Sequence, residues 1–290
     1  MRLNILVVGC GYVGTALGTD LVKSGGEVWG LRRDPAALGG LKSLGIKPIQ
    51  ADLLGLKSFA GLPQADFVVM CQALSRPTDS YRKTYCEGTG NLISALKNKK
   101  PRKLILISST SVYGIHDGSW VDENTDPAAS GYSTKETEEN AECLLEAERT
   151  VLTSGIPSII FRLGGIYGPA RNRIKLLKEG KITPSFSEVY TNRIHVEDVV
   201  RGIKLLIKKG KMGEIYLGVD DKPCTQKEFY SWLCDKLTIK PAVKGAPATD
   251  TVVARASNKL CSNKKLKALG MKFKYPTYRE GYEPILIAID

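Results

Sequence analysis

Short apolar runs alternate along this chain with longer segments in which apolar residues recur at helical spacing. Short runs bounded by turn residues are typical of buried strands, and the longer segments are typical of amphipathic helices. Regular alternation of the two predicts an α/β fold, a doubly wound parallel sheet with helices on both faces. The pattern predicts strands at 4–8, 27–31, 47–50, 67–71, 104–108, 158–163 and 215–219, and helices at 14–24, 36–44, 81–98, 135–154 and 226–237.

The turn after the first predicted strand carries a glycine motif, Gly9-x-Gly11-x-x-Gly14. Gly9 permits a tight turn, Gly11 lets the backbone approach a pyrophosphate, and Gly14 lets the next helix pack closely on the strand. The first N–H groups of that helix, near Tyr12 and Val13, are available to phosphate oxygens. A strand, these glycines and a helix in this order predict a dinucleotide-binding site of the Rossmann type.

The end of the second predicted strand indicates which dinucleotide is bound. An NAD site usually places an Asp or Glu about twenty residues after the glycines, where it binds the ribose 2′-hydroxyl. In this chain Arg32 and Arg33 occupy that place. A guanidinium binds a 2′-phosphate through charge-assisted hydrogen bonds. We therefore predict that NADP(H) is preferred by at least about tenfold, with NAD(H) as the other possible cofactor. The alternative is that both arginines are solvated surface charges.

The regular alternation ends near residue 165, where Gly168-Pro169 opens a less regular part of the chain. Ligands of open α/β sheets bind outside the carboxyl ends of the strands, so we expect a small-molecule substrate there. We predict a Rossmann-type NAD(P)-binding domain over residues 1–165, with 191–220 returning to it. A smaller C-terminal substrate-binding lobe is predicted from residues 166–190 and 221–290.

Composition limits the class of protein. The 290 residues are 42% hydrophobic and 25% charged, as in ordinary globular proteins. No apolar run reaches the roughly 18 residues of a membrane span, and a strand pattern begins at Asn4, so we expect neither a membrane partner nor a signal peptide. Seven cysteines are scattered singly and only two histidines are present. This usage predicts no metal site, reduced thiols and a cytoplasmic location.

The chain is basic, with a formal net charge of +12. Basic proteins can bind nucleic acid. Here the basic runs lie at predicted helix ends and loops without interleaved aromatic residues. We interpret them as solvated surface that attracts an anionic cofactor or substrate, and we consider a nucleic-acid partner unlikely. The runs are 97–103, 208–211 and 259–274.

Several further motifs follow the glycine turn along the chain. The run SSTSVYG, Ser108–Gly114, follows the fifth predicted strand; the others are Ala51-Asp52-Leu53, Glu87–Leu92, Arg162–Pro169 and Asn192–Val199. Together they resemble the extended and atypical branches of the short-chain dehydrogenase/reductase superfamily, the NAD(P)-dependent epimerase/dehydratase group. The tail over 272–282 resembles an atypical subgroup with poorly defined substrates. The resemblance implies cofactor contacts at Asp52, Leu53 and Ala73.

The resemblance also implies three catalytic groups. A Ser or Thr binds the reacting oxygen, a Tyr moves the proton, and a Lys four residues later binds the ribose and lowers the pKa of the Tyr. Ser109 matches the hydroxyl position. The nearest match to the pair is Tyr132 with Lys135, in which the lysine comes one residue early and Glu136 takes its usual place. Residues three apart still share a helix face, although a carboxylate at the fourth position raises the pKa of a Tyr.

A second alignment, counted back from residues 142–148, puts Asn140 and Leu144 at the two positions and leaves no Tyr/Lys pair. Both alignments stay open from the sequence. His195 is expected to be a structural histidine.

These observations favour an NADP(H)-dependent oxidoreductase or epimerase/dehydratase-type enzyme. Its substrate would carry a hydroxyl or carbonyl on a small polar, possibly sugar-like, molecule. The alternative is a catalytically impaired NADPH-binding sensor or interaction module, suggested by the broken Tyr/Lys spacing. The resemblance further implies a possible homodimer through the helices at 81–98 and 135–154.

Overall fold

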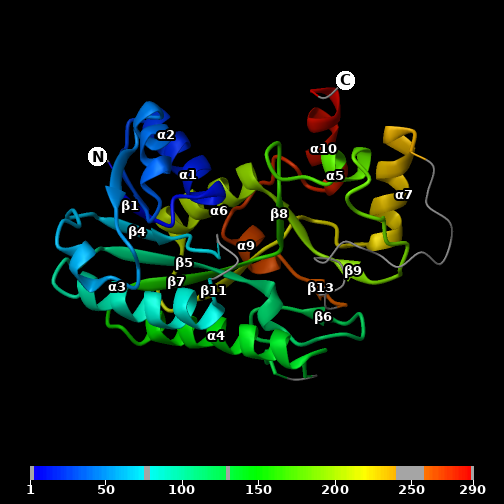
Figure 1. Ribbon diagram of the computed structural model, residues 1–290. Helices are drawn as coiled ribbons and strands as arrows, with labels where there is room; N and C mark the ends of the chain where they lie inside the picture. Colours follow the sequence, from blue (N-terminus) through cyan, green and yellow to red (C-terminus); the bar gives the residue numbers. More distant parts are fainter. Residues whose placement is uncertain (1–2, 75–78, 129–130, 240–257, 289–290) are drawn as a thin grey trace. The chain divides into compact units, whose positions relative to one another are not determined.

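The chain was analysed as a computed structural model, which describes residues 3–74, 79–128, 131–239 and 258–288 (Figure 1). Its centre is a seven-stranded parallel sheet with the order β11-β7-β5-β4-β1-β2-β3. Because β1 lies between β4 and β2, the order of strands reverses beside β1, and its carboxyl end is a topological switch point. The strands are β1 (Asn4–Val8), β2 (Glu27–Arg32), β3 (Lys47–Gln50), β4 (Phe67–Met70), β5 (Lys103–Ser109), β7 (Ser158–Leu163) and β11 (Ile215–Gly218).

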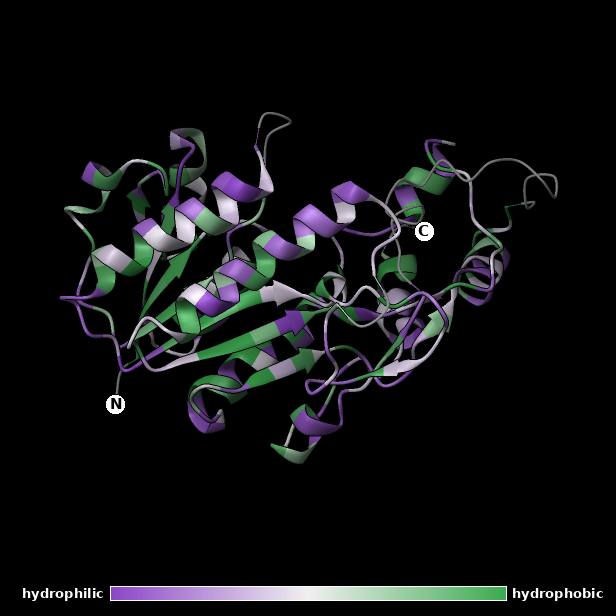
Figure 2. Ribbon diagram, turned by 90° about the horizontal axis from the view of Figure 1, so that it is seen from below, coloured by the Kyte–Doolittle hydropathy of each residue, from purple (hydrophilic) through white to green (hydrophobic). Residues whose placement is uncertain are grey.

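Helices cover both faces of the sheet (Figures 1 and 2). On one face lie α1 (Tyr12–Lys23), α2 (Leu38–Ser43) and α6 (Val196–Lys209). On the other lie α3 (Gly88–Leu96) and α4 (Lys135–Leu152), which run side by side in both views. Short 3₁₀ turns occupy Pro35–Ala37 and Leu56–Phe59, and a π-helical turn, Arg82–Glu87, leads into α3. The doubly wound α/β fold predicted from the sequence is confirmed.

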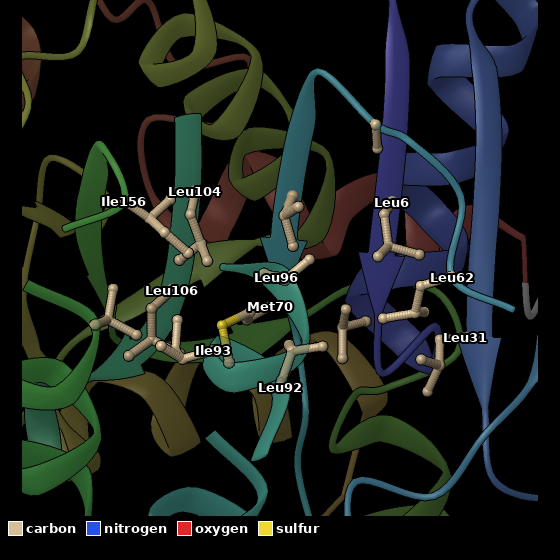
Figure 3. Packing of buried hydrophobic residues seen from close by; sticks show 14 of the residues in the cluster. Leu6, Leu31, Leu62, Met70, Leu92, Ile93, Leu96, Leu104, Leu106 and Ile156 are labelled. Atoms are coloured by element: carbon tan, nitrogen blue, oxygen red, sulfur yellow. The ribbon is translucent and has the colours of Figure 1, made fainter. Parts of the chain in front are cut away.

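Alternate residues of the buried strands supply the two faces. Leu6, Met70 and Leu106 belong to one cluster of buried side chains with Leu92 and Leu96 of α3 (Figure 3). On the opposite face, glycines let two helices approach the sheet. A Cβ on Gly18 of α1 would lie 2.6 Å from Ile46, and one on Gly202 of α6 would lie 2.8 Å from the Phe161 ring.

The chain divides into two compact units. Unit 1 comprises Met1–Ser109, Glu139–Arg162 and Val200–Tyr216; unit 2 comprises Thr110–Glu138, Leu163–Val199 and Leu217–Asp290. The cofactor-binding domain and the substrate-binding lobe predicted from the sequence are defined by what they bind, and both stay a prediction.

Unit 2 is built from short strand pairs and helices. Its strand pairs are β6 (Trp120–Val121) with β13 (Leu260–Cys261), β8 (Gly165–Tyr167) with β10 (Arg193–His195), and β9 (Tyr190–Thr191) with β12 (Cys224–Thr225). Its other elements are the 3₁₀ turn Thr110–Val112 and the helices α5 (Ile174–Lys178), α7 (Gln226–Leu237), α9 (Lys264–Ala268) and α10 (Tyr278–Ile287). An aromatic core joins α7 to α10: the Phe229 ring contacts the Tyr278 and Tyr282 rings, each at 5.3 Å. Thr277 and Glu280 form a capping box at the start of α10. Their side chains accept hydrogen bonds from backbone N–H groups that have no partner within the helix, which favours helix initiation.

Two lysines correct the interpretation of the basic runs as solvated surface. Lys103 is only 6% exposed, and its ammonium donates to the Leu206, Ile207 and Gly210 carbonyls at 2.9–3.0 Å. These carbonyls lie at the end of α6, where the Leu206 carbonyl also accepts the Gly210 amide at 2.9 Å, so the buried cation is bound at the negative end of a helix. Lys259 is 3% exposed and donates to the Tyr113 carbonyl at 3.1 Å. Burial lowers the pKa of its ammonium to about 8.

All seven cysteines are free thiols, as expected, and all but Cys71 are fully buried. Desolvation raises the pKa of Cys10 to about 11 and that of Cys261 to about 12. Within the described ranges, no helix is long and apolar enough to cross a bilayer, and no group of His, Cys, Asp and Glu is arranged to hold a metal ion.

Candidate functional site

The loop between β1 and α1 has a backbone that only glycine allows. Gly9 has φ +76°, and a Cβ there would lie 2.7 Å from the Gln72 backbone at the end of β4. A Cβ on Gly14 would lie 2.9 Å from the Gly9 carbonyl and from a Val7 methyl. Both glycines therefore keep α1 close to β1, as the motif predicts.

Gly11 has a different environment from its neighbours. A Cβ there would lie 3.3 Å from the end of the flexible Arg32 side chain and 3.9 Å from the Gly9 carbonyl, which accepts the Gly11 amide at 2.7 Å. The helix α1 starts at the next residue, Tyr12, and no acidic side chain lies in its first turn. The positive end of a helix dipole suits a pyrophosphate. The residues present thus fit the phosphates of a dinucleotide.

The two arginines at the end of β2 have different partners. The Arg32 guanidinium reaches back to the glycine loop, where its Nη1 donates to the Cys10 carbonyl at 3.1 Å. Arg33 forms a bidentate ion pair with Asp79, with both N···O distances at 3.0 Å. The hydrogen bonds to Asp79 raise the pKa of the Arg33 guanidinium. Asp79 was missed in the sequence, because it lies 46 residues from Arg33 and no local motif marks it.

The loops after β3 and β4 bring the other predicted cofactor residues to the same edge. Asp52 accepts the Leu54 amide at 3.0 Å, and Leu53 is tied to α3 because its carbonyl accepts the Asn91 side chain at 2.9 Å. Ala73 is exposed just after β4. Its neighbour Gln72 is buried and donates to Thr89 at 3.0 Å, yet its Oε1 has no donor within the described residues. The parallel pairing of β1 to β4 explains why these loops converge.

Ser109 is the last residue of β5 in unit 1 and is partly exposed. The preceding residue, Ser108, points into the core and donates to Glu148 of α4 at 2.6 Å. Glu148 also accepts two hydrogen bonds from Arg162 of β7, at 2.9 and 2.6 Å. All three side chains of this network are at most 6% exposed. The network therefore fixes the end of β5 and the rotation of α4. The sequence motifs contained Ser108 and Arg162 but did not predict their contact with Glu148.

The predicted Tyr/Lys pair lies in unit 2. The Tyr132 hydroxyl donates to the Val112 carbonyl at 2.7 Å and lies 3.4 Å from the Pro127 carbonyl. Lys135 is the first residue of α4 and is exposed. In the second alignment, Leu144 takes the lysine position, but its side chain is only 4% exposed and packs in the core. An apolar side chain there provides no cation for a ribose or a phenol.

His195, at the end of β10, lies among aromatic rings. It is 1% exposed, with its ring 4.0 Å from the Tyr275 ring and 5.2 Å from the Tyr167 ring. Its Nδ1 accepts the Glu197 amide at 3.2 Å. Burial lowers the pKa of the imidazole to about 4, so the ring is neutral near pH 7. These contacts are those of the structural histidine expected from the sequence.

A Rossmann sheet with a glycine loop and a helix N-terminus at its switch point defines a class, the dinucleotide-binding α/β proteins. Within that class, the chain belongs to the NAD dependent epimerase/dehydratase family, whose model matches residues 5–217. This family comprises NAD(P)-dependent enzymes of the extended short-chain dehydrogenase/reductase type, as the motifs suggested.

Individual relatives agree on the family and differ in activity. A 4-hydroxy-2-methyl-3-oxo-4-farnesyl-3,4-dihydroquinoline-1-oxide ketoreductase of Stigmatella aurantiaca is 26% identical over 82% of this chain and 74% of its own length. The low-salt glycan biosynthesis protein Agl12 of Haloferax volcanii is 27% identical over 48% of this chain. That match spans 46% of the Haloferax protein, so the chain aligns with less than half of this relative.

Solved structures extend the likeness over the whole chain. A Methylobacillus flagellatus protein, provisionally described as an NAD-dependent epimerase/dehydratase, is 30% identical with a TM-score of 0.79, covering 100% of this chain and 99% of its own. A dTDP-glucose 4,6-dehydratase of Bacillus anthracis in complex with NAD has a TM-score of 0.80, covering 99% of this chain and 96% of its own. The latter is 19% identical and supports the fold alone.

Proposed function

We propose that this chain is an NADP(H)-dependent oxidoreductase or epimerase/dehydratase-type enzyme that acts on a hydroxyl or carbonyl group of a small polar, sugar-like substrate. The observation that carries the proposal is the glycine loop, in which Gly9 and Gly14 hold α1 against the sheet and Gly11 lies beside the Arg32 guanidinium. Membership of an NAD dependent epimerase/dehydratase family supports it. A relative named as a dTDP-glucose 4,6-dehydratase supports the sugar-like substrate, and one named as a 2-alkyl-3-oxoalkanoate reductase supports a carbonyl as the reacting group.

The residues of unit 1 would hold the cofactor. In this proposal the Gly11 backbone and the first turn of α1, at Tyr12 and Val13, bind the pyrophosphate. Arg32 binds the 2′-phosphate of NADP(H) from the end of β2. Asp52, Leu53 and Ala73 contact the adenosine part. The bound nicotinamide supplies or accepts a hydride.

Ser109, Tyr132 and Lys135 are the proposed catalytic residues. The Ser109 hydroxyl would bind the reacting oxygen, and the Tyr132 hydroxyl would move the proton, with Lys135 supporting its charge. Tyr132 donates to the Val112 carbonyl in this structure. Tyr132 must therefore break this hydrogen bond before it transfers a proton to a substrate. In the proposed order, the substrate first displaces the Val112 carbonyl from the Tyr132 hydroxyl.

The proposal also covers the location and the oligomeric state of the enzyme. We place it in the cytoplasm, on the basis of its free thiols. A homodimer through α3 and α4 is retained as a proposal, although the acidic residues Glu138, Glu139 and Glu142 are exposed on α4 and would repel a second copy.

Parallel titrations with NADPH and NADH, followed by cofactor fluorescence, test the cofactor assignment. We expect NADPH to bind at least about tenfold more tightly than NADH. In a turnover assay with a carbonyl substrate, Ser109→Ala should abolish activity while leaving the NADPH affinity within about twofold. Ser111→Ala, an exposed serine two residues further on, is the matched control and should retain activity. Full activity of Ser109→Ala would refute its role.

A second candidate function is an NADPH-binding sensor or interaction module without efficient catalysis. The observation that favours it is the Tyr132 hydroxyl, which is hydrogen-bonded to the backbone and lacks a lysine four residues later. Tight NADPH binding without turnover across a panel of carbonyl compounds and nucleotide sugars would support this candidate. Turnover that Tyr132→Phe abolishes would exclude it.

A further inference from the structure

The ion pair between Arg33 and Asp79 lies at the end of β2. Both guanidinium Nη atoms of Arg33 donate to the two carboxylate oxygens of Asp79 at 3.0 Å. The Asp79 side chain is 10% exposed and that of Arg33 is 31% exposed. A bidentate pair with one member nearly buried holds both groups in a fixed geometry.

The position of this pair matters for the cofactor. The residue that follows β2 in dinucleotide-binding folds meets the 2′ position of the adenosine ribose, and Arg33 follows the last residue of β2 directly. The sequence has Arg33 at this position, and the acid that follows it, Asp34, caps the Ala36 amide. The fold supplies another acid in space, since Asp79 arrives from the segment between β4 and the π-helical turn Arg82–Glu87. An arginine and a carboxylate thus occupy the same corner of the candidate site.

The two groups favour different dinucleotides. A 2′-phosphate carries negative charge and must either displace the Asp79 carboxylate from Arg33 or bind close to it, and like charges at such distances repel. A ribose 2′-hydroxyl is a donor, which a carboxylate accepts. Arg32 differs from Arg33, because its guanidinium rests on the Cys10 carbonyl and has no ion-pair partner among the described residues.

We propose that Asp79 is a specificity-determining residue, which neutralises Arg33 and so limits the preference for NADP(H) while retaining affinity for NAD(H). The proposal rests on the proposed function, because it concerns the same dinucleotide site. In this arrangement Arg32 alone binds the 2′-phosphate, because the Arg33 guanidinium is already paired with Asp79.

The test measures Kd for NADPH and for NADH by fluorescence titration of the full chain and of Asp79→Asn. The variant keeps the size of the side chain and removes its charge. We expect NADPH to bind about tenfold more tightly to Asp79→Asn and NADH to bind equally or more weakly. The matched control is Asp34→Asn, which removes an exposed charge one residue from Arg33 while keeping an acceptor for the Ala36 amide that Asp34 caps. Its ratio of affinities should change less than about twofold.

A double variant separates a direct effect from a general loss of structure. In Arg33→Gln/Asp79→Asn, the gain in NADPH affinity relative to Arg33→Gln should fall below about threefold, because Asp79 acts through Arg33. An unchanged ratio in Asp79→Asn, or a loss of NADPH affinity there, would overturn the proposal; the loss would mean that Asp79 orients Arg33 toward the phosphate. Failure of the unmodified chain to bind either dinucleotide would instead overturn the proposed function, and this inference with it.

Discussion

At the residue scale, His195 shows how burial turns a titratable side chain into a structural one. Its ring is enclosed by Tyr167 and Tyr275, and its Nδ1 accepts a backbone amide, which a protonated ring cannot do. Glu197 favours protonation and Lys274 opposes it, but desolvation is the larger effect on the pKa. The neutral form is therefore part of the folded state.

This environment predicts acid sensitivity. The folded pKa of His195 is about 4, below the ordinary 6.5, so its contribution to stability is complete above pH 6.5 and is lost as the pH falls toward 4. The shift corresponds to about 3 kcal/mol. His195→Asn keeps an acceptor for the Glu197 amide without titrating. Urea unfolding between pH 4 and 7 should show a steeper loss of unfolding free energy for the unmodified chain, and parallel curves would contradict the assignment.

Residue-scale predictions succeeded where the cause is local. Gly9 and Gly14 have the conformation and close contacts that the motif requires, because a tight turn depends on adjacent residues. Asp79 and Lys259 could not be found in this way, since their roles arise from contacts with residues 46 and 146 positions away. A basic run in a sequence does not distinguish an exposed lysine from one that the fold buries.

At the scale of elements, the Ser108–Glu148–Arg162 network joins β5, α4 and β7. Glu148→Gln should lower the free energy of unfolding by about 3 kcal/mol, because it removes the negative charge that binds the buried Arg162 guanidinium. Glu146→Gln is the control on the same helix. That carboxylate is 41% exposed and 3.6 Å from Arg82, so the change should stay within about 0.5 kcal/mol. Equal effects of the two variants in chemical denaturation would contradict the role of the network.

The seven strands of the sheet were predicted to within a residue at each end. For β1, β4 and β7 the cause is a largely apolar run that both faces bury, whereas the edge strand β3 is mostly exposed. The helix α6 was not predicted, although its apolar residues recur at helical spacing. The strand pairs of unit 2 are two or three residues long. A period cannot be read from so few residues, and their pairing depends on contacts across the chain.

At the scale of the whole molecule, the positive charge is unevenly placed. Lys103 reaches the end of α6, so the basic runs 97–103 and 208–211 meet within unit 1, with Lys100, Lys208 and Lys209 exposed. Such a surface binds polyanions through counterion release and without base contacts. We expect duplex DNA to bind weakly at about 20 mM salt and to be released by about 150 mM in fluorescence anisotropy. Sequence-dependent binding that survives about 150 mM salt would contradict the interpretation.

Because buried thiols lie in both units, their reactivity can report the local opening of each unit. Cys10, Cys86 and Cys143 are buried in unit 1, whereas Cys224, Cys234 and Cys261 are buried in unit 2. A buried thiol reacts with an alkylating reagent only when its surroundings open. Both units carry several such thiols in the natural sequence. Timed alkylation followed by peptide mass spectrometry can therefore follow the opening of each unit separately, and can show which unit a bound dinucleotide holds closed.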